Sequence, residues 1–256
     1  MEVIMKRLLP LAILGFLFSP PAISAQHTGS AKKFVKKGIE LFAKGDLAGA
    51  IIQYDRALTA DPKLAEAYLN RGNAKRAADD LDSAIADYET AGELEPQLFT
   101  NNRDISQAYL TRGYQRSNRL ELDGALADFD RAIKLDPRDA EAYFKRGRAL
   151  LIDGSVDFAI ADFDKSISLD DRNPLVYAER GFARQTRGEK NAAEEDFARG
   201  LKLNNDLRFT LDMHLLELQL QIKEMRRRQA TRRRNIASLN GYSLRDGEFR
   251  HRVPVV

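Results

Sequence analysis

Residues 143–171 read YFKRGRALLIDGSVDFAIADFDKSISLDD, and this stretch contains each element of a pattern that recurs along the chain. A tyrosine precedes an Arg-Gly pair, and an alanine, an aromatic residue and a small residue follow at fixed offsets. Gly113, Gly147 and Gly181 are spaced 34 residues apart. The other copies have the same positions, with a weaker first copy: Phe34, Gly38, Ala50, Tyr54 and Ala57; Tyr68, Gly72, Ala84, Tyr88 and Ala91; Tyr109, Gly113, Ala125, Phe129 and Ala132; Tyr177, Gly181, Ala193, Phe197 and Gly200. Self-similarity at this period indicates a stacked array of helical units.

The spacing within each copy predicts two helices joined by a turn. Ala84, Tyr88 and Ala91 stand at i, i+4 and i+7, which is one face of a helix. Turn residues such as Gly154-Ser155 precede this second helix, although the third copy has Leu120-Glu121 there. The helix pairs are therefore expected at 31–44 and 47–60, 65–77 and 81–94, 106–118 and 122–135, 140–153 and 156–169, and 174–187 and 190–203.

The pattern resembles the tetratricopeptide repeat (TPR) family over residues 31–206. The resemblance implies an all-α, right-handed TPR solenoid of five helix-turn-helix repeats, with a protein-binding adaptor or scaffold role. The expected repeats are 31–64, 65–98, 106–139, 140–173 and 174–206.

The family's concave groove is lined by exposed positions of the first helix of each repeat. The resemblance maps candidate groove residues onto the following positions: Phe42, Leu69, Asn73, Arg76, Tyr114, Phe144, Arg148 and Phe182. Aromatic and arginine side chains are frequent binding anchors. Burial between neighbouring repeats is the alternative explanation for each aromatic residue.

The first 25 residues have the organisation of an export signal. Lys6 and Arg7 precede an apolar run from Leu8 to Phe18, and Ser19-Pro20-Pro21 and small residues follow. Cleavage is expected after Ala25, which makes the protein periplasmic or secreted; an uncleaved membrane anchor is the alternative. The chain has no cysteine, so disulfides, an acylated lipoprotein form and thiol catalysis are excluded.

The C-terminal end differs in composition from the repeats. Residues 226–256 hold nine arginines against Asp246 and Glu248, whereas the repeats are net acidic in a chain of net charge +3. An apolar stripe in 207–228 predicts a helix that caps the last repeat, or alternatively a dimer contact in a protein expected to be a monomer. Residues 229–256 are expected to be a disordered basic tail. The candidate residues for binding an anionic surface are Arg226, Arg227, Arg228, Arg232, Arg233 and Arg234.

The sequence contains no pattern typical of a catalytic or metal-binding site. The three histidines, His27, His214 and His251, have no metal-ligand spacing. The acidic residues Asp87, Asp128, Asp162 and Asp196 occupy the same position in successive copies. An active site is built once, so a repeated position indicates a structural role. We expect no enzyme activity, cofactor or metal.

The sequence is compatible with two functions. The first is an exported adaptor that binds a protein or peptide segment in the concave groove. The second is an envelope tether whose arginine-rich tail binds anionic lipid or polymer. Nucleic acid is not an expected partner, because an exported protein rarely meets it.

Two details of the pattern give local predictions. Pro96 and Pro137 are seven residues further apart than Pro62 and Pro96, and we expect the extra residues to extend a helix from about residue 99, with a loop as the alternative. Arg71, Arg112, Arg146 and Arg180 occur in the same four copies as the repeated aspartates, whereas the first copy has Lys37 and Gln53. This joint occurrence predicts a ladder of Arg–Asp pairs.

Overall fold

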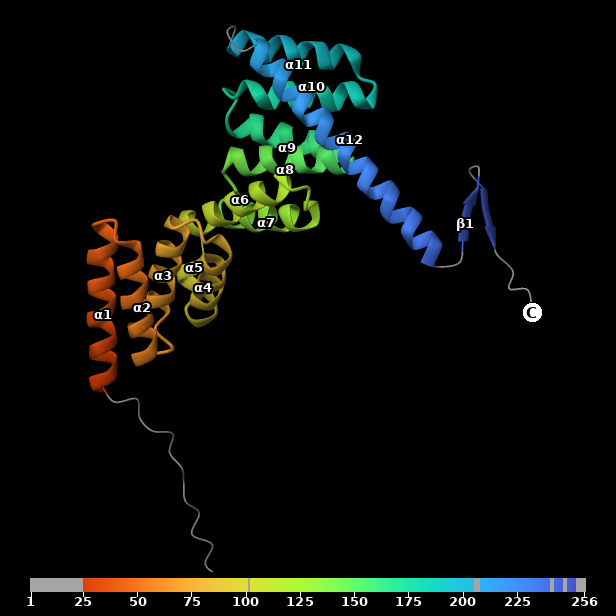
Figure 1. Cartoon of the computed structure of the whole chain (residues 1–256). Helices are drawn as coiled ribbons and strands as arrows, with labels where there is room; N and C mark the ends of the chain where they lie inside the picture. Colours follow the sequence, from red (N-terminus) through yellow and green to blue (C-terminus); the bar gives the residue numbers. More distant parts are fainter. Residues whose placement is uncertain (1–24, 101, 205–207, 240–241, 246–247, 252–256) are drawn as a thin grey trace, which may run out of the picture.

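The protein folds into five antiparallel helix pairs followed by one long helix and a hairpin (Figure 1). The structure is a computed structural model that describes residues 25–100, 102–204, 208–239, 242–245 and 248–251. The expected signal, residues 1–25, lies outside this part of the chain except for Ala25. The five pairs are α1 (Ala25–Ala43) with α2 (Leu47–Ala60), α3 (Ala65–Ala77) with α4 (Leu81–Leu94), α6 (Arg103–Asn118) with α7 (Leu122–Leu135), α8 (Ala140–Asp153) with α9 (Val156–Leu169), and α10 (Pro174–Arg187) with α11 (Lys190–Leu203). The predicted all-α array of five helix pairs is confirmed, and the larger differences are at the start of α1 and of α6.

The repeated glycine and aromatic residue explain how each pair closes. The aromatic ring of the second helix lies on the bare backbone of the glycine in the first helix. A Cβ added to Gly113 would lie 2.8 Å from the Phe129 ring, and in the other four pairs the ring would also be less than 3.0 Å away. Phe129 is fully buried. The repeat therefore needs glycine at this position because the ring occupies the space of a side chain.

The turns within the pairs share one backbone geometry in spite of different sequences. Gly45, Gly154 and Gly188 have positive φ angles, and Asp79 and Leu120 take the same left-handed conformation at φ 63° and 60°. Leu120 has no side chain that favours this conformation. Its partial burial against the core compensates for the backbone strain. The conformation of the third turn is thus stabilised by the packing of Leu120 and not by a residue type that favours positive φ angles.

The seven extra residues of the third repeat do not extend a helix. They form a single turn, α5 (Pro96–Phe99), and α6 begins only at Arg103. The prediction of a helix from about residue 99 is therefore wrong. The side chain of Asn102 accepts hydrogen bonds from the backbone N–H groups of Asp104 (3.0 Å) and Ile105 (3.3 Å), which makes Asn102 a helix N-cap. A helix passing through this position would lose that cap.

The C-terminal segment differs from the prediction in length and in position. A single helix, α12 (Arg208–Leu239), continues 11 residues past the expected end of a cap at residue 228. Beyond it, β1 (Tyr242–Arg245) pairs antiparallel with β2 (Glu248–His251). The expectation of disorder from residue 229 is wrong for these residues. Arginine, glutamine and alanine, which make up most of residues 226–234, are good helix formers. The helix therefore continues although apolar residues no longer recur at helical spacing.

Candidate functional site

The first helices of the repeats form the inner, concave surface of the array. α1 contacts α3, α6 contacts α8, and α8 contacts α10, whereas α2, α4, α7 and α9 each pack between two first helices. α12 also contacts α8 and α10 (Figure 1). We call the surface of α8 and α10 beneath α12 the closed half of the groove, and the surface of α1, α3 and α6 the open half.

The closed half is filled by the apolar face of α12. Leu218 is fully buried and Ile222 is nearly so, and both belong to the same core as Phe144 and Leu151. Met225 packs against this core one turn further on. The expected cap on the last repeat is thus a helix that runs back over the concave side of repeats four and five. Full burial of such side chains contributes about 1.5–3 kcal/mol each, which is why the stripe follows the apolar groove.

Polar contacts fix the position of α12 along the groove. Nη2 of Arg148 donates a hydrogen bond to Oε1 of Gln221 at 3.2 Å and lies 3.7 Å from Glu217. On its other side, Nε of Arg148 lies 3.9 Å from Oε1 of the buried Glu179. Further along, Nε2 of Gln229 lies 3.5 Å from Oδ1 of Asp153. Arg148 therefore joins α12 to two repeats.

Three of the predicted groove residues belong to this closed half. Phe144 and Arg148 are 3% and 7% exposed, so the expectation that they are open binding residues is wrong in this conformation. Phe182 is half-buried and lines a hollow beside α12 together with Lys223 and Arg226. The aromatic and arginine side chains at these three positions are suited to binding, and in this chain they contact α12.

The open half exposes the remaining apolar candidates. Phe42 and Tyr114 are exposed on α1 and α6, and Ile39 is exposed one turn before Phe42. Leu69 is half-buried on α3 between them. The ammonium of Lys145 lies 4.3 Å from the centre of the Tyr114 ring, a cation–π distance. An apolar surface with a positive charge at one end thus remains accessible.

The two polar candidates of repeat two make contacts within the array. The Tyr88 hydroxyl donates a hydrogen bond to Oδ1 of Asn73 at 2.8 Å. Nη2 of Arg76 donates to Oδ1 of Asp104 at 2.8 Å, which joins α3 to the start of α6. Asn73 and Arg76 therefore hold the repeats together, and a ligand would have to compete with these partners.

The predicted Arg–Asp ladder is present in all four copies. Each arginine donates from Nε and Nη2 to both oxygens of the aspartate 16 residues later, as Arg146 does to Asp162 at 2.7 Å each. The other pairs are Arg71–Asp87, Arg112–Asp128 and Arg180–Asp196. The hydrogen bond to Asp162 raises the pKa of Arg146 above its usual value against the opposing effect of burial. These arginines are held by two-point pairs and belong to the framework.

A further contact of the ladder joins neighbouring repeats and was not predicted. Nη1 of Arg146 donates to Oδ1 of Asp130 in the preceding repeat at 2.7 Å. Arg71 and Arg180 reach Asp55 and Asp164 in the same way. Each guanidinium also lies over the ring of the tyrosine three residues before it. This inter-repeat contact could have been predicted from the sequence, because an aspartate follows the second-helix aromatic residue in the first, third and fourth copies.

A cleft on the second-helix side accompanies the insertion. It lies between repeats two and three, and α5 forms one wall with Phe99. Glu89, Tyr109 and Arg131 line the remainder, and the Tyr109 hydroxyl donates to Oε1 of Glu89 at 2.9 Å. Burial and this hydrogen bond raise the pKa of Tyr109. This cleft was not predicted from the sequence.

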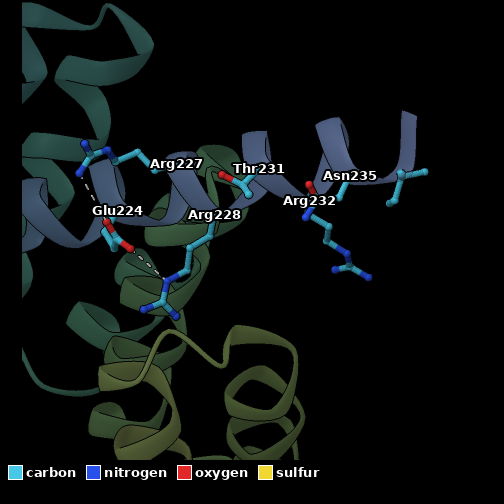
Figure 2. Close-up of a pocket in the computed structure, with 7 residues that line it drawn as sticks. Glu224, Arg227, Arg228, Thr231, Arg232 and Asn235 are labelled. Carbon is cyan, nitrogen blue, oxygen red and sulfur yellow. Dashed lines mark hydrogen bonds and ion pairs between the residues drawn. The ribbon is translucent and has the colours of Figure 1, made fainter. Parts of the chain in front are cut away.

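The arginines of α12 form a second candidate surface. All six predicted residues are exposed, and Figure 2 shows Arg227, Arg228 and Arg232 around a hollow on the helix surface. Glu224 lies 3.2 Å from Nε of Arg228 and 4.0 Å from Nη1 of Arg227. In the part of the chain that the structure describes, no cluster of acidic or histidine side chains is arranged to hold a metal ion, and no helix has the length and hydropathy of a membrane span.

Comparison with known families agrees with the fold and the repeat pattern. Three models match, described as TPR repeat over residues 38–78 and as tetratricopeptide repeat over residues 65–98 and 110–174. The chain belongs to the tetratricopeptide repeat family. TPR proteins are typically protein-interaction scaffolds, and this chain has that architecture.

Several solved TPR structures are similar to this chain. A crystal structure of MamA protein is 26% identical with a TM-score of 0.54, covering 70% of this chain and 93% of that one. A structure described as "YrrB: a TPR protein with an unusual peptide-binding site" is 21% identical with a TM-score of 0.56, covering 77% and 100%. MamA from Desulfovibrio magneticus RS-1 is 19% identical with a TM-score of 0.52, covering 73% and 99%. No curated protein matches the chain.

Proposed function

We propose that this TPR protein is an exported, non-enzymatic adaptor that holds an apolar segment of a partner protein in the open half of its groove. The observation that carries this proposal is the packing of α12 against α8 and α10. Its buried residues Leu218 and Ile222 share a core with groove residues of repeats four and five. The concave surface of this chain therefore accepts a helical segment through an apolar stripe.

The open half offers the same kind of surface to another molecule. Ile39, Phe42 and Tyr114 are exposed large apolar side chains on first helices, and no described segment covers them. Aromatic side chains bury a large area at a small cost in side-chain entropy, so they are efficient anchors. Lys145 beside Tyr114 favours a segment with a carboxylate or a carbonyl near its aromatic-binding residue. A structural neighbour described as having a peptide-binding site supports peptide binding as the general mode.

Peptides selected from a random displayed library against the full chain would test the proposal. The selected peptides are synthesised, and their dissociation constants are measured by calorimetry with the parent chain and with Phe42→Ala and Tyr114→Ala. Each substitution removes an anchor and is expected to weaken binding by about fivefold or more, which corresponds to roughly 1 kcal/mol.

Ile52→Ala and Phe158→Ala are matched controls, because both side chains are exposed on second helices, away from the groove. These variants should leave the dissociation constants unchanged. Peptides that respond to the control variants and not to Phe42 or Tyr114 would show that the partner surface is on the opposite side of the array.

Export and oligomeric state have separate tests. The N-terminal charge and apolar run support export, and sequencing the N-terminus of the mature protein should give Gln26 as the first residue. Cytoplasmic protein that keeps residues 1–25 would contradict export. The protein is proposed to be a monomer, because the buried stripe of α12 is used within the chain. Light scattering at increasing concentration would reveal a dimer.

A further inference from the structure

The C-terminal half of α12 concentrates positive charge on a segment that leaves the array. Residues 226–234 read RRRQATRRR, and no aspartate or glutamate occurs from Met225 to Arg245. Arg228 and Gln229 contact the repeats, and the helix continues outward past them (Figure 1). The residues from Ala230 to Ile236 are all exposed.

The six arginines surround the helix and do not form one face. At about 100° per residue, the arginines fall in three directions around the helix: Arg226 with Arg233, Arg227 with Arg234, and Arg228 with Arg232. The outer triplet 232–234 alone places one arginine in each direction. Ala230 is the only apolar residue among 226–234. A helix that lies on a membrane needs an apolar face opposite its basic face, and this segment has none.

Some of these arginines are partly neutralised by the protein. Glu224 contacts Arg227 and Arg228, and Nη1 of Arg228 donates to the backbone oxygen of Arg119 at 3.3 Å. On the side that faces the array, a hollow lined by Arg228 and Arg232 also contains Glu121, Asp123 and Asp153. Among the side chains that the structure describes, Arg226, Arg232, Arg233 and Arg234 have no carboxylate within ion-pair distance. The uncompensated charge is therefore greatest at the outer triplet, 232–234.

We propose that residues 226–234 of α12 bind a linear phosphate polymer, a chain of phosphodiesters or of condensed phosphate. Guanidinium groups bind phosphate oxygens through two parallel hydrogen bonds, which makes arginine well suited to such a chain. A flexible polymer can follow charges on several sides of a helix, whereas a flat bilayer meets only one side. The acidic repeats repel a polyanion, so the ligand is directed to the projecting helix and away from the groove.

The sequence alone left open a tail that binds anionic lipid or polymer, and this site narrows that alternative to a phosphate polymer; it does not depend on the groove proposal. Both ligands present phosphate, so the arrangement of arginines around the helix decides between them. A tether to a bilayer would use one face, and a polymer site uses all of them.

The test measures binding of the full chain to a fluorescein-labelled 20-nucleotide single-stranded DNA, used as a phosphodiester chain, by fluorescence anisotropy at several salt concentrations. Inorganic polyphosphate is the competitor. Arg232→Gln, Arg233→Gln and Arg234→Gln are combined in one variant, which keeps good helix formers at all three positions. We expect the variant to bind at least tenfold more weakly at low salt. The slope of log affinity against log salt should fall by about two, because each lost contact on a single strand removes about 0.7.

Two controls separate a specific site from general charge. Arg56→Gln, Arg103→Gln and Arg138→Gln remove the same charge from exposed positions on the array and should change the affinity by less than twofold. Lysine at positions 232, 233 and 234 keeps the charge and should retain most of the salt slope.

Vesicles containing phosphatidylserine form the other arm of the test. Binding to vesicles without binding to the oligonucleotide or to polyphosphate would overturn the proposal in favour of a membrane-surface site. Equal losses in the array variant and in the α12 variant would also overturn it, because the attraction would then belong to the whole surface.

Discussion

Arg112 holds Asp128 with two hydrogen bonds, from Nε at 3.0 Å and from Nη2 at 2.7 Å, and its remaining nitrogen reaches Asp82 in the preceding repeat. The other three ladder arginines use the carboxylate that follows the second-helix aromatic of the preceding repeat. In repeat two that position is Glu89, which accepts a hydrogen bond from Tyr109 instead. The exception falls at the junction with the seven-residue insertion. The different partner of Arg112 therefore indicates that repeats two and three stack differently from the other neighbouring repeats.

Removing the buried carboxylate of this pair should be costly. Asp128 is 2% exposed and accepts from Arg112 and from Nη1 of Arg116 at 2.9 Å. Asp128→Asn leaves two guanidinium groups without their buried anion and with only the exposed Asp82 as a partner. We expect a loss of about 3–5 kcal/mol in the free energy of unfolding. Urea denaturation followed by circular dichroism measures this change.

Asp82→Asn is the matched control, because it removes a partner of the same arginine at a side chain that is 80% exposed. Its expected cost is only about 0–1 kcal/mol. Equal costs for the two variants would show that burial does not determine the strength of the ladder.

The repeated glycine gives a prediction in which one substitution has opposite effects at two positions. A Cβ on Gly113 would lie 2.8 Å from the Phe129 ring and 3.1 Å from Cβ of Asp128, so Gly113→Ala should destabilise the array by roughly 1–3 kcal/mol. Gly29 is also helical, but nothing lies within 4 Å of an added Cβ there. Gly29→Ala should therefore be neutral or stabilising by up to about 1 kcal/mol. Thermal unfolding of both variants checks the difference in sign.

Local spacing was enough to predict the helix pairs and the ladder within each repeat. Gly113 and Phe129 lie in one copy of the pattern, so their contact follows from the periodicity. The inter-repeat partner of Arg112 could not be found in this way, because it depends on how the insertion changes the stacking. The left-handed Leu120 was equally hidden, since its conformation is imposed by the core and contradicts local preference.

The sequence predicted which residues lie on the concave surface, but it did not predict which of them are exposed. The period of the repeats identifies Phe144 and Arg148 as concave residues. Whether they are open depends on the path of α12, which contacts Arg148 across 73 residues of sequence. The stripe of Leu218 and Ile222 indicated an apolar face, and it did not indicate which surface that face covers.

The buried tyrosine of repeat two should make stability depend on alkaline pH. Burial raises the pKa of Tyr88 to about 12 from the usual 10. The folded state therefore keeps a proton that the unfolded state releases above pH 10, and the contribution of this residue is fully present below pH 10 and is lost between pH 10 and 12. Tyr88→Phe should reduce the fall in stability over this range. Denaturation curves at pH 9, 10, 11 and 12 give the two slopes, and parallel slopes would contradict the assignment.

Leu218 anchors α12 on the concave surface of α8 and α10. Leu218 is 0% exposed and packs in the same core as Phe144, so Leu218→Ala should leave a cavity and cost about 2–5 kcal/mol, either in global unfolding or in release of the helix. Hydrogen exchange measured by mass spectrometry distinguishes these outcomes. If the helix is released, exchange should rise in 208–229 and in α8 and α10, while α1 to α4 stay protected.

Leu220→Ala deletes the same atoms two residues away, at a side chain that is 56% exposed on the outer face of α12. Because that side chain loses little buried area, the variant should unfold within about 0.5 kcal/mol of the parent chain and exchange at the same rate. A Leu218→Ala protein that matches Leu220→Ala in both measurements would mean that α12 does not rest on the groove in solution. Phe144, Arg148 and Phe182 would then be open to a ligand, and the binding surface would extend over all five repeats.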